Sequence, residues 1–161
     1  MPAANPSSGS GPGAHLRALG LELPTMPKPL GNYVEVSQAG SLLFVSGTLP
    51  VANGKLAISG RLGDNLSVEQ GREAARLAAM NALAAVQEHV GDLDQVKKLA
   101  KLNIYLAATA QFTDHAAVAD GASDLFAQLF SKENGHARMV SGVASLPKGT
   151  PVVVETVFET Y

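Results

Sequence analysis

One arginine and one glutamate stand inside two strand-like runs in the last part of the sequence. Arg138 lies in the run at 136–143 and Glu155 in the run at 152–157. Because side chains alternate along a strand, the guanidinium of Arg138 would point from a largely apolar strand, and valines would flank the carboxylate of Glu155. A charge in such a place needs a partner, a ligand or a wet cleft. The pattern therefore permits two interpretations, a site for an anionic ligand or an Arg138–Glu155 ion pair between adjacent strands.

The chemistry that these residue types favour is the binding of a small carboxylate. A guanidinium presents a planar fork of donors that fits a carboxylate bidentately, so Arg138 is the first candidate. Glu155 is a candidate general base toward a bound water. Ser46 has no G-x-S-x-G context and no paired histidine and aspartate, so we expect it to donate a hydrogen bond rather than act as a nucleophile. His136 shares the predicted face of Arg138, and we place it at the rim.

Composition excludes several classes of site and partner. The 161 residues contain no cysteine, which removes disulfides, thiolate catalysis and cysteine metal sites. Four histidines show no ligand spacing, so no metal is expected. A net charge of −2 argues against a nucleic-acid binder. No signal peptide is visible and no apolar run reaches the ~18 residues that span a membrane, so we expect a cytoplasmic protein with no membrane partner.

The hydrophobic pattern places these residues on a sheet covered by two helices. A capping box of Ser67 and Gln70 starts the first long helix. The expected elements are a hairpin over 33–46 that turns at 39–40, a short strand at 55–59, a helix at 68–90, a strand at 99–106, a helix at about 115–131 and the two closing strands. The order is β-β-(β)-α-β-α-β-β, a single α+β domain with a mixed sheet and both long helices on one face.

Two further expectations concern the outside of this domain. Residues 1–27 are rich in glycine and proline and read as an N-terminal arm before a domain at 28–161, with a short helix or turn ending near Gly20. Two helices cover only one face of a sheet, yet several strands are apolar on both faces. The uncovered face then needs a partner, which predicts a homo-oligomer with sites between its subunits.

These motifs resemble the Rid (reactive intermediate deaminase, or YjgF-like) family. The resemblance rests on Gly-Asn-Tyr33 before a strand, the Ser46-Gly47-x-x-Pro50 motif, and Arg138 followed by Leu-Pro147 and Glu155. It covers about residues 28–160 and points to a larger subgroup. The resemblance implies a chorismate-mutase-like fold and a homotrimer with clefts between subunits. It further implies hydrolysis of reactive enamines and imines, such as 2-aminoacrylate, to 2-keto acids and ammonia without a cofactor.

The resemblance also assigns roles to individual residues. Arg138 matches the arginine that binds the substrate carboxylate, and Tyr33 matches a tyrosine at the cleft. Ser46 and Gly47 match a pair whose hydroxyl and backbone line it. Glu155 matches the second of two alternate acidic positions in the last strand.

Three positions depart from the pattern of this family. The first of the two acidic positions holds Val153, and the position often held by a cysteine holds Val140. Asp120 stands nearest to a common asparagine. The expected function is therefore a carboxylate-anchoring enamine/imine deaminase, and the alternative is a trimeric protein that binds or senses a small carboxylate without turnover. A ribonuclease is disfavoured by the acidic charge balance and sparse aromatics.

Overall fold

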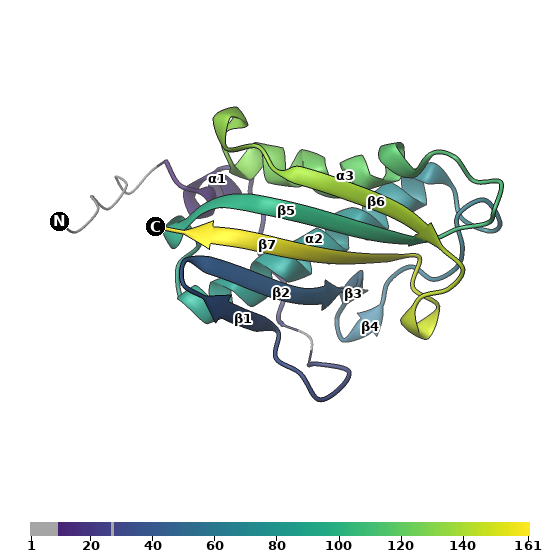
Figure 1. Cartoon of the computed structure of the whole chain (residues 1–161), viewed down its shortest axis with the longest axis horizontal. Helices are drawn as coiled ribbons and strands as arrows, with labels where there is room; N and C mark the ends of the chain where they lie inside the picture. Colours follow the sequence, from purple (N-terminus) through teal and green to yellow (C-terminus); the bar gives the residue numbers. More distant parts are fainter. Residues whose placement is uncertain (1–9, 27) are drawn as a thin grey trace.

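A five-stranded mixed sheet forms the body of the protein in a computed structural model, which describes residues 10–26 and 28–161 (Figure 1). The strand order is β1-β2-β7-β5-β6. The strands are β1 (Val36–Ala39), β2 (Leu42–Thr48), β5 (Val96–Ala107), β6 (Ala137–Val143) and β7 (Val152–Thr160). Within this sheet β5 and β6 pair in parallel, and the other neighbouring strands pair antiparallel. The predicted α+β class and the single mixed sheet are confirmed.

Two long helices, α2 (Val68–Val90) and α3 (His115–Leu129), pack on the same face of this sheet, as predicted (Figure 1). The capping box starts α2, because Ser67 Oγ accepts from the Gln70 amide while the Gln70 side chain accepts from the Ser67 amide. Gly91, at a φ of 84°, ends it. A Cβ on Gly121 of α3 would lie 2.8 Å from Arg72 Cα, so a glycine lets the two helices cross closely.

The core lies between the helices and the inner face of the sheet. Alanines of α2 face strand residues that are fully buried, among them Leu102, Val154 and Phe158. No helix of the described residues lies over the outer face of the sheet, and its strands carry Phe44 and Met139 with 46% and 58% of their surface exposed. The inner face therefore supplies the burial that stabilises the fold, and the outer face leaves large apolar side chains in solvent.

β5 separates the two strands that carry Arg138 and Glu155. The chain leaves β6, forms a short 3-10 turn at η3 (Pro147–Gly149) and passes the end of β5, where the Ala107 amide donates to the Pro151 carbonyl. β7 then inserts between β5 and β2. The expectation that these runs form adjacent strands is therefore wrong, because the connection crosses over β5 instead of turning back on β6.

Smaller elements close the ends of the fold. β3 (Val51–Ala52) and β4 (Lys55–Leu56) make a separate two-stranded sheet, so the predicted strand at 55–59 is shorter and pairs with β3. Two 3-10 turns, η1 (Leu93–Gln95) and η2 (Lys132–Asn134), precede β5 and β6. Within residues 10–26 and 28–161, no helix is both long and apolar enough to cross a membrane, and no group of three or more His, Cys, Asp or Glu side chains is placed to hold a metal ion.

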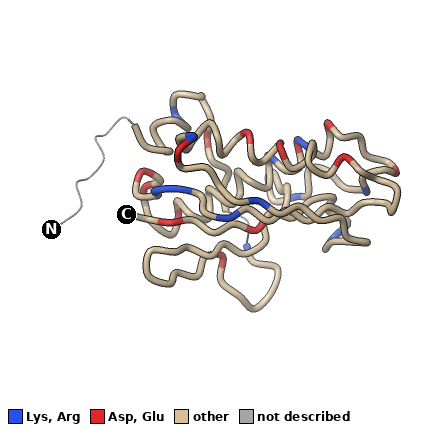
Figure 2. Tube along the Cα trace, turned by 45° about the horizontal axis from the view of Figure 1, so that its top comes forward, with Lys and Arg blue, Asp and Glu red and all other residues tan. Residues whose placement is uncertain are grey.

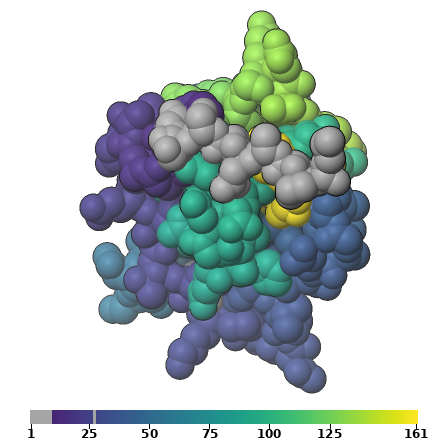
Figure 3. Space-filling model, turned by 90° about the vertical axis from the view of Figure 1, so that its left-hand side faces the viewer, coloured from purple at the N-terminus to yellow at the C-terminus, as the bar shows by residue number. Residues whose placement is uncertain are grey.

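A short helix, α1 (Pro12–Ala18), packs against the domain near α3 (Figure 3). Leu16 is buried in the core, and Asp94 Oδ1 accepts from the amide of Gly13 at 2.7 Å. The predicted arm thus includes a helix that starts earlier than its sequence pattern indicated. Residues 1–9 and 27 lie outside the described residues, and the division of the chain between 27 and 28 stays a prediction.

Candidate functional site

Arg138 sits at the start of the edge strand β6 and points toward α3. Its Nη1 atom donates to Asp120 Oδ1 at 2.6 Å and to Ser123 Oγ at 3.2 Å. Asp120 and Ser123 are three residues apart and therefore share one face of α3. His136 Nε2 lies 2.9 Å from the same Ser123 oxygen. We call these four residues the Arg138 cluster.

The cluster fixes one side of the guanidinium. Nη1 carries two N–H groups, and Asp120 and Ser123 use both. Among the described residues, Nη2 and Nε of Arg138 have no hydrogen-bond partner. That free edge has the geometry for a bidentate bond to a carboxylate, and the side chain is 26% exposed.

Burial beside a cation controls the protonation of His136. Desolvation lowers the pKa of His136, and the positive charge of Arg138 lowers it further. The imidazole is therefore neutral at neutral pH, where one ring nitrogen accepts a hydrogen bond. Its ring also packs edge-on against Phe126, at a centroid distance of 6.2 Å. His136 lies in this cluster and is half-buried, and its position at the rim of a cleft stays a prediction.

The other predicted residues gather on the outer face of the sheet, around β2 and β7. Tyr33, Ser46 and Glu155 line a shallow depression of about 420 Å³. Ser46 Oγ donates to the Val34 carbonyl at 2.7 Å, so this hydroxyl fixes the backbone beside Tyr33. Glu155 Oε1 accepts from Asn103 Nδ2 at 2.9 Å. The depression offers a carboxylate and a phenol but no arginine.

Gly47 holds a close contact at the wall of this region. A Cβ on Gly47 would lie 2.8 Å from Cγ1 of Val153. The glycine is therefore required by the valine that stands at the first acidic position of the resemblance. Val140 follows Arg138 on the inner face and packs half-buried against the core, so its side chain contributes to packing.

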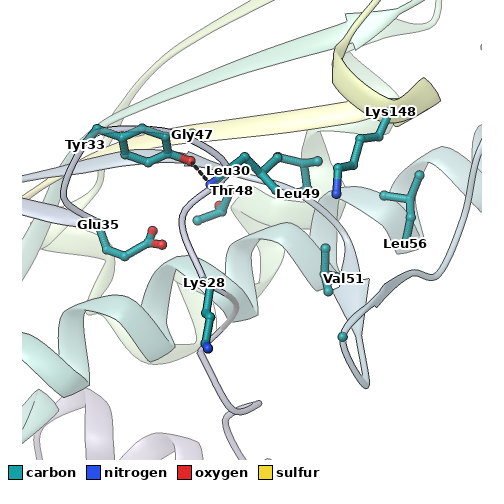
Figure 4. Close-up of a pocket in the computed structure, with 11 residues that line it drawn as sticks. Lys28, Leu30, Tyr33, Glu35, Gly47, Thr48, Leu49, Val51, Leu56 and Lys148 are labelled. Atoms are coloured by element: carbon teal, nitrogen blue, oxygen red, sulfur yellow. Dashed lines mark hydrogen bonds between the residues drawn. The ribbon is translucent and has the colours of Figure 1, made fainter.

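A deeper cavity of about 340 Å³ shares Tyr33 with the shallow depression. Figure 4 shows the residues that line the deeper cavity. Tyr33 and Gly47 line it together with Lys28, Glu35 and Lys148. The Tyr33 hydroxyl accepts from the Leu30 amide at 3.1 Å. Partial burial raises the pKa of Glu35, and the nearby charge of Glu88 raises it further. An acid, two lysines and apolar walls thus surround a space large enough for a small metabolite.

Arg138 and Glu155 do not meet within one chain. Arg138 is the register partner of the fully buried Leu102, on the helix-covered face. Glu155 is the partner of Asn103, the next residue of β5, whose side chain points to the outer face. The two charges lie on opposite faces and two strands apart. The interpretation as an Arg138–Glu155 ion pair is wrong, because Asp120 is the acidic partner of Arg138.

Sequence reasoning missed several residues that the structure brings to these places. Ser123 completes the Arg138 cluster, and its position one helical turn after Asp120 was an available signal. Asn103 binds Glu155 from the neighbouring strand. Lys28 and Glu35 reach the deeper cavity from the segment before β1, and Lys148 reaches it from η3. No local sequence pattern predicts that these three residues line one cavity.

Comparison with known proteins settles the family. Residues 13–159 match the family described as "YjgF/chorismate mutase-like, putative endoribonuclease". The chain belongs to the YjgF family. This YjgF chain is 42% identical over 147 residues to Protein TCP17 of Trypanosoma cruzi, which covers 91% of this chain and 92% of that protein. It is 26% identical over 142 residues to a 2-iminobutanoate/2-iminopropanoate deaminase of Dermatophagoides farinae, over 85% and 92% of the two chains.

A solved structure gives the same fold for the whole domain. A crystal structure described as that of "a putative endoribonuclease" from Shewanella oneidensis superposes with a TM-score of 0.88 at 36% identity, over 92% of this chain and 99% of that one. The Rid resemblance and the chorismate-mutase-like fold are thereby confirmed. The names within the YjgF family include deaminases and endoribonucleases, so the activity has to be argued from the site.

Proposed function

We propose that this YjgF protein hydrolyses reactive enamine and imine acids of the 2-aminoacrylate type to 2-keto acids and ammonia. The observation that carries the proposal is the free Nη2–Nε edge of Arg138, held in place by Asp120 and Ser123 through Nη1. A fixed guanidinium with an unused fork is suited to a small carboxylate. The distant relative named as a 2-iminobutanoate/2-iminopropanoate deaminase supports this substrate class.

This reaction depends more on the positions of the substrate and one water than on strong catalytic groups. An enamine acid first takes up a proton from solvent at its terminal carbon and becomes an iminium ion, whose C=N carbon is electrophilic. Water adds to that carbon, the C–N bond then breaks, and a C=NH₂⁺ group and one water become a C=O group and NH₄⁺. Holding the carboxylate and one water in line supplies much of the acceleration. No metal, cofactor or covalent intermediate is required by this balance.

In our proposal the catalytic cleft forms between copies of the chain in a homotrimer. Arg138 lies at the β6 edge, whereas Tyr33, Ser46 and Glu155 lie on the outer face toward the β1 edge. One chain cannot bring these groups together, but a neighbour that packs on the exposed outer face could place its Arg138 opposite them. Exposed Phe44 supports such packing. Tyr33 and Glu155 would then orient the water, with Glu155 as its base.

Keto-acid release tests the activity directly. A separate amino-acid dehydratase generates 2-aminoacrylate, and release of pyruvate is followed with wild type, Arg138→Ala and Arg138→Lys. We expect acceleration by wild type and a loss of at least about a hundredfold in both variants, because lysine cannot form the bidentate contact. A wild type that accelerates no imino acid would refute the deaminase.

Mixing of variants tests the shared cleft. Arg138→Ala damages one half of each site and Tyr33→Ala the other, so refolding the two together should produce about a quarter of intact sites by random pairing in a closed ring. Recovered activity above that of either variant alone supports a cleft built from two chains. A monomer by light scattering, or no recovery in a mixed oligomer, contradicts it.

The alternative function is binding or sensing of a small carboxylate without turnover. The observation that favours it is Val153, which replaces an acid at the first of the two acidic positions and is wedged against Gly47. An Arg138-dependent rise in melting temperature with a carboxylate, together with no acceleration of imine hydrolysis, would identify this function.

Figure 2 shows lysine and arginine interspersed with acidic positions, which gives no support to an RNA-binding surface.

A further inference from the structure

Asp120 places a second carboxylate at the group that would bind the substrate. Its Oδ1 atom accepts from Arg138 Nη1 at 2.6 Å, and its side chain is 46% exposed. A bond of that length between charged groups is a strong one. A ligand carboxylate on the free edge of Arg138 would therefore share one guanidinium with a resident carboxylate.

The charge balance of this arrangement depends on the ligand. Within one chain, one guanidinium offsets one negative charge, so a simple anion leaves the Arg138 cluster with a net charge of −1, and the two carboxylates repel one another across the guanidinium. In the proposed cleft, Glu155 of a neighbouring copy adds a further negative charge to this balance. A ligand with a positive group next to its carboxylate brings no net charge. Its cation can face Asp120 while its carboxylate faces the Nη2–Nε edge. Nearby charges of opposite sign favour such an arrangement even where solvent screens them.

The surrounding groups do not remove this constraint. His136 is neutral at neutral pH, because burial and Arg138 both lower its pKa. Ser123 is uncharged and satisfied by Arg138 and His136. The next acid on the helix, Asp124, binds Arg72 at 3.1 Å and points to another surface. Among the described residues, Asp120 is the only acidic partner of Arg138.

We propose that Asp120 makes the Arg138 site selective for zwitterions, above all the iminium form of a 2-imino acid, over simple anionic carboxylates. The inference rests on the proposed function and deepens it. The substrate in its reactive form is a zwitterion, whereas the keto-acid product is an anion. Hydrolysis replaces the cationic nitrogen with an uncharged oxygen, so the product loses its attraction to Asp120 and is expelled.

Alanine and lactate are the probes, because they share a carboxylate and a methyl group and differ in an ammonium or a hydroxyl at the same carbon. Titration calorimetry measures the ratio of their dissociation constants for the full-length protein at pH 7. We expect wild type to bind alanine about tenfold more tightly than lactate, the size of effect that partly exposed neighbouring charges produce. Asp120→Asn keeps the shape and a hydrogen bond to Arg138, and should reduce the preference to about threefold or less.

Asp124→Asn is the matched control, because it removes the same charge from the same helix but not from Arg138. It should leave the ratio unchanged. Inhibition by pyruvate gives an independent readout, and Asp120→Asn should strengthen it about as much as it strengthens lactate binding. Equal ratios in wild type and Asp120→Asn, or an equal shift in Asp124→Asn, overturn the inference.

The outcomes separate this inference from the proposed activity. Imine turnover together with an Asp120-independent ratio overturns zwitterion selection and leaves the deaminase standing. Binding of neither probe by wild type also overturns the inference, and the keto-acid assay then decides the deaminase alone. Circular dichroism verifies that Asp120→Asn is folded. If it is not, Asp120→Ser takes its place in the same titrations.

Discussion

Asn81 of α2 pins the segment that lines the deeper cavity, and its replacement tests how that wall is held. The side chain is 1% exposed, and its Nδ2 atom donates to the carbonyls of Leu49 at 2.8 Å and Val51 at 3.0 Å. Both carbonyls belong to residues that line the cavity. The Asn81 Oδ1 atom is buried and has no hydrogen-bond partner in the part of the chain that the structure describes. The amide therefore acts only as a donor here.

The cost of Asn81→Ala follows from these contacts. Two hydrogen bonds are lost at about 1 kcal/mol each. The Leu49 carbonyl keeps a bond from the Val51 amide at 2.9 Å, and removal of the unpaired Oδ1 returns up to about 1 kcal/mol. The smaller side chain leaves a small cavity that adds to the loss. We expect a net loss of about 1–3 kcal/mol and a melting temperature lower by roughly 3–10 °C.

Asn81→Asp is the sharper variant because it keeps the shape and removes the donors. At pH 7 a buried carboxylate would face two carbonyl oxygens, so Asn81→Asp should be less stable than Asn81→Ala. Burial raises the pKa of the introduced carboxyl above its value of about 3.9 in the unfolded chain. The loss of stability of Asn81→Asp should therefore shrink as the pH falls toward about 3.9 and grow as the pH rises. Urea unfolding at pH 7 and pH 4 measures both. An Asn81→Ala loss under about 0.5 kcal/mol, or Asn81→Asp as stable as Asn81→Ala at pH 7, refutes the reasoning.

Three further predictions concern stability. Gly47→Ala should cost about 1–3 kcal/mol, because its Cβ would lie 2.8 Å from Val153 Cγ1. A double-mutant cycle with Val153→Ala should then show a coupling of about 1 kcal/mol, and additive losses would contradict the contact. Ser67→Ala should cost about 1 kcal/mol in urea unfolding, while Ser67→Asp, which retains a capping oxygen, should lose less. Glu35 has a raised pKa in the folded state, so it binds a proton more readily there and stability falls as the pH rises above 4.5. Glu35→Gln should therefore melt above wild type at pH 7, and a gain that persists at pH 4 would mean a cause other than charge.

The helices could be predicted from the sequence because residues at their ends determine where they start and stop. The capping box and Gly91 predict α2 at Val68–Val90, the range that the structure has. The end of α3 is less well marked, and the helix stops at Leu129 rather than near 131. Its Asp114 cap makes no side-chain hydrogen bond, so the side-chain oxygen does not fix the start of this helix. Local signals thus predict an element well where side chains satisfy its ends.

The order of the strands and the face on which each side chain lies could not be predicted from local sequence signals. A turn at 147–151 between two strand-like runs favours a hairpin locally, yet β5 offers pairing to both runs and lies between them. Which face Arg138 occupies depends on its register with Leu102, a residue far away in the sequence. In the strand at 99–106 the apolar set with Leu102 and Ile104 was predicted to face the helices and is buried. In the strand of Arg138 the alternation of side chains predicted two sets of residues but not which set the helices cover. Long-range packing decides both questions.

The position of β7 has a consequence for how the protein is made. β7 is the last strand of the sheet to leave the ribosome, and it lies between β2 and β5, to both of which it pairs. Until it arrives, the β1–β2 hairpin and the β5–β6 pair are two half-sheets with unpaired edges. At about 5–20 residues per second, a nascent chain spends seconds in that state. The sheet is therefore completed only when β7 has emerged, after all four other strands, and until then the edges of β2 and β5 that face it stay unpaired.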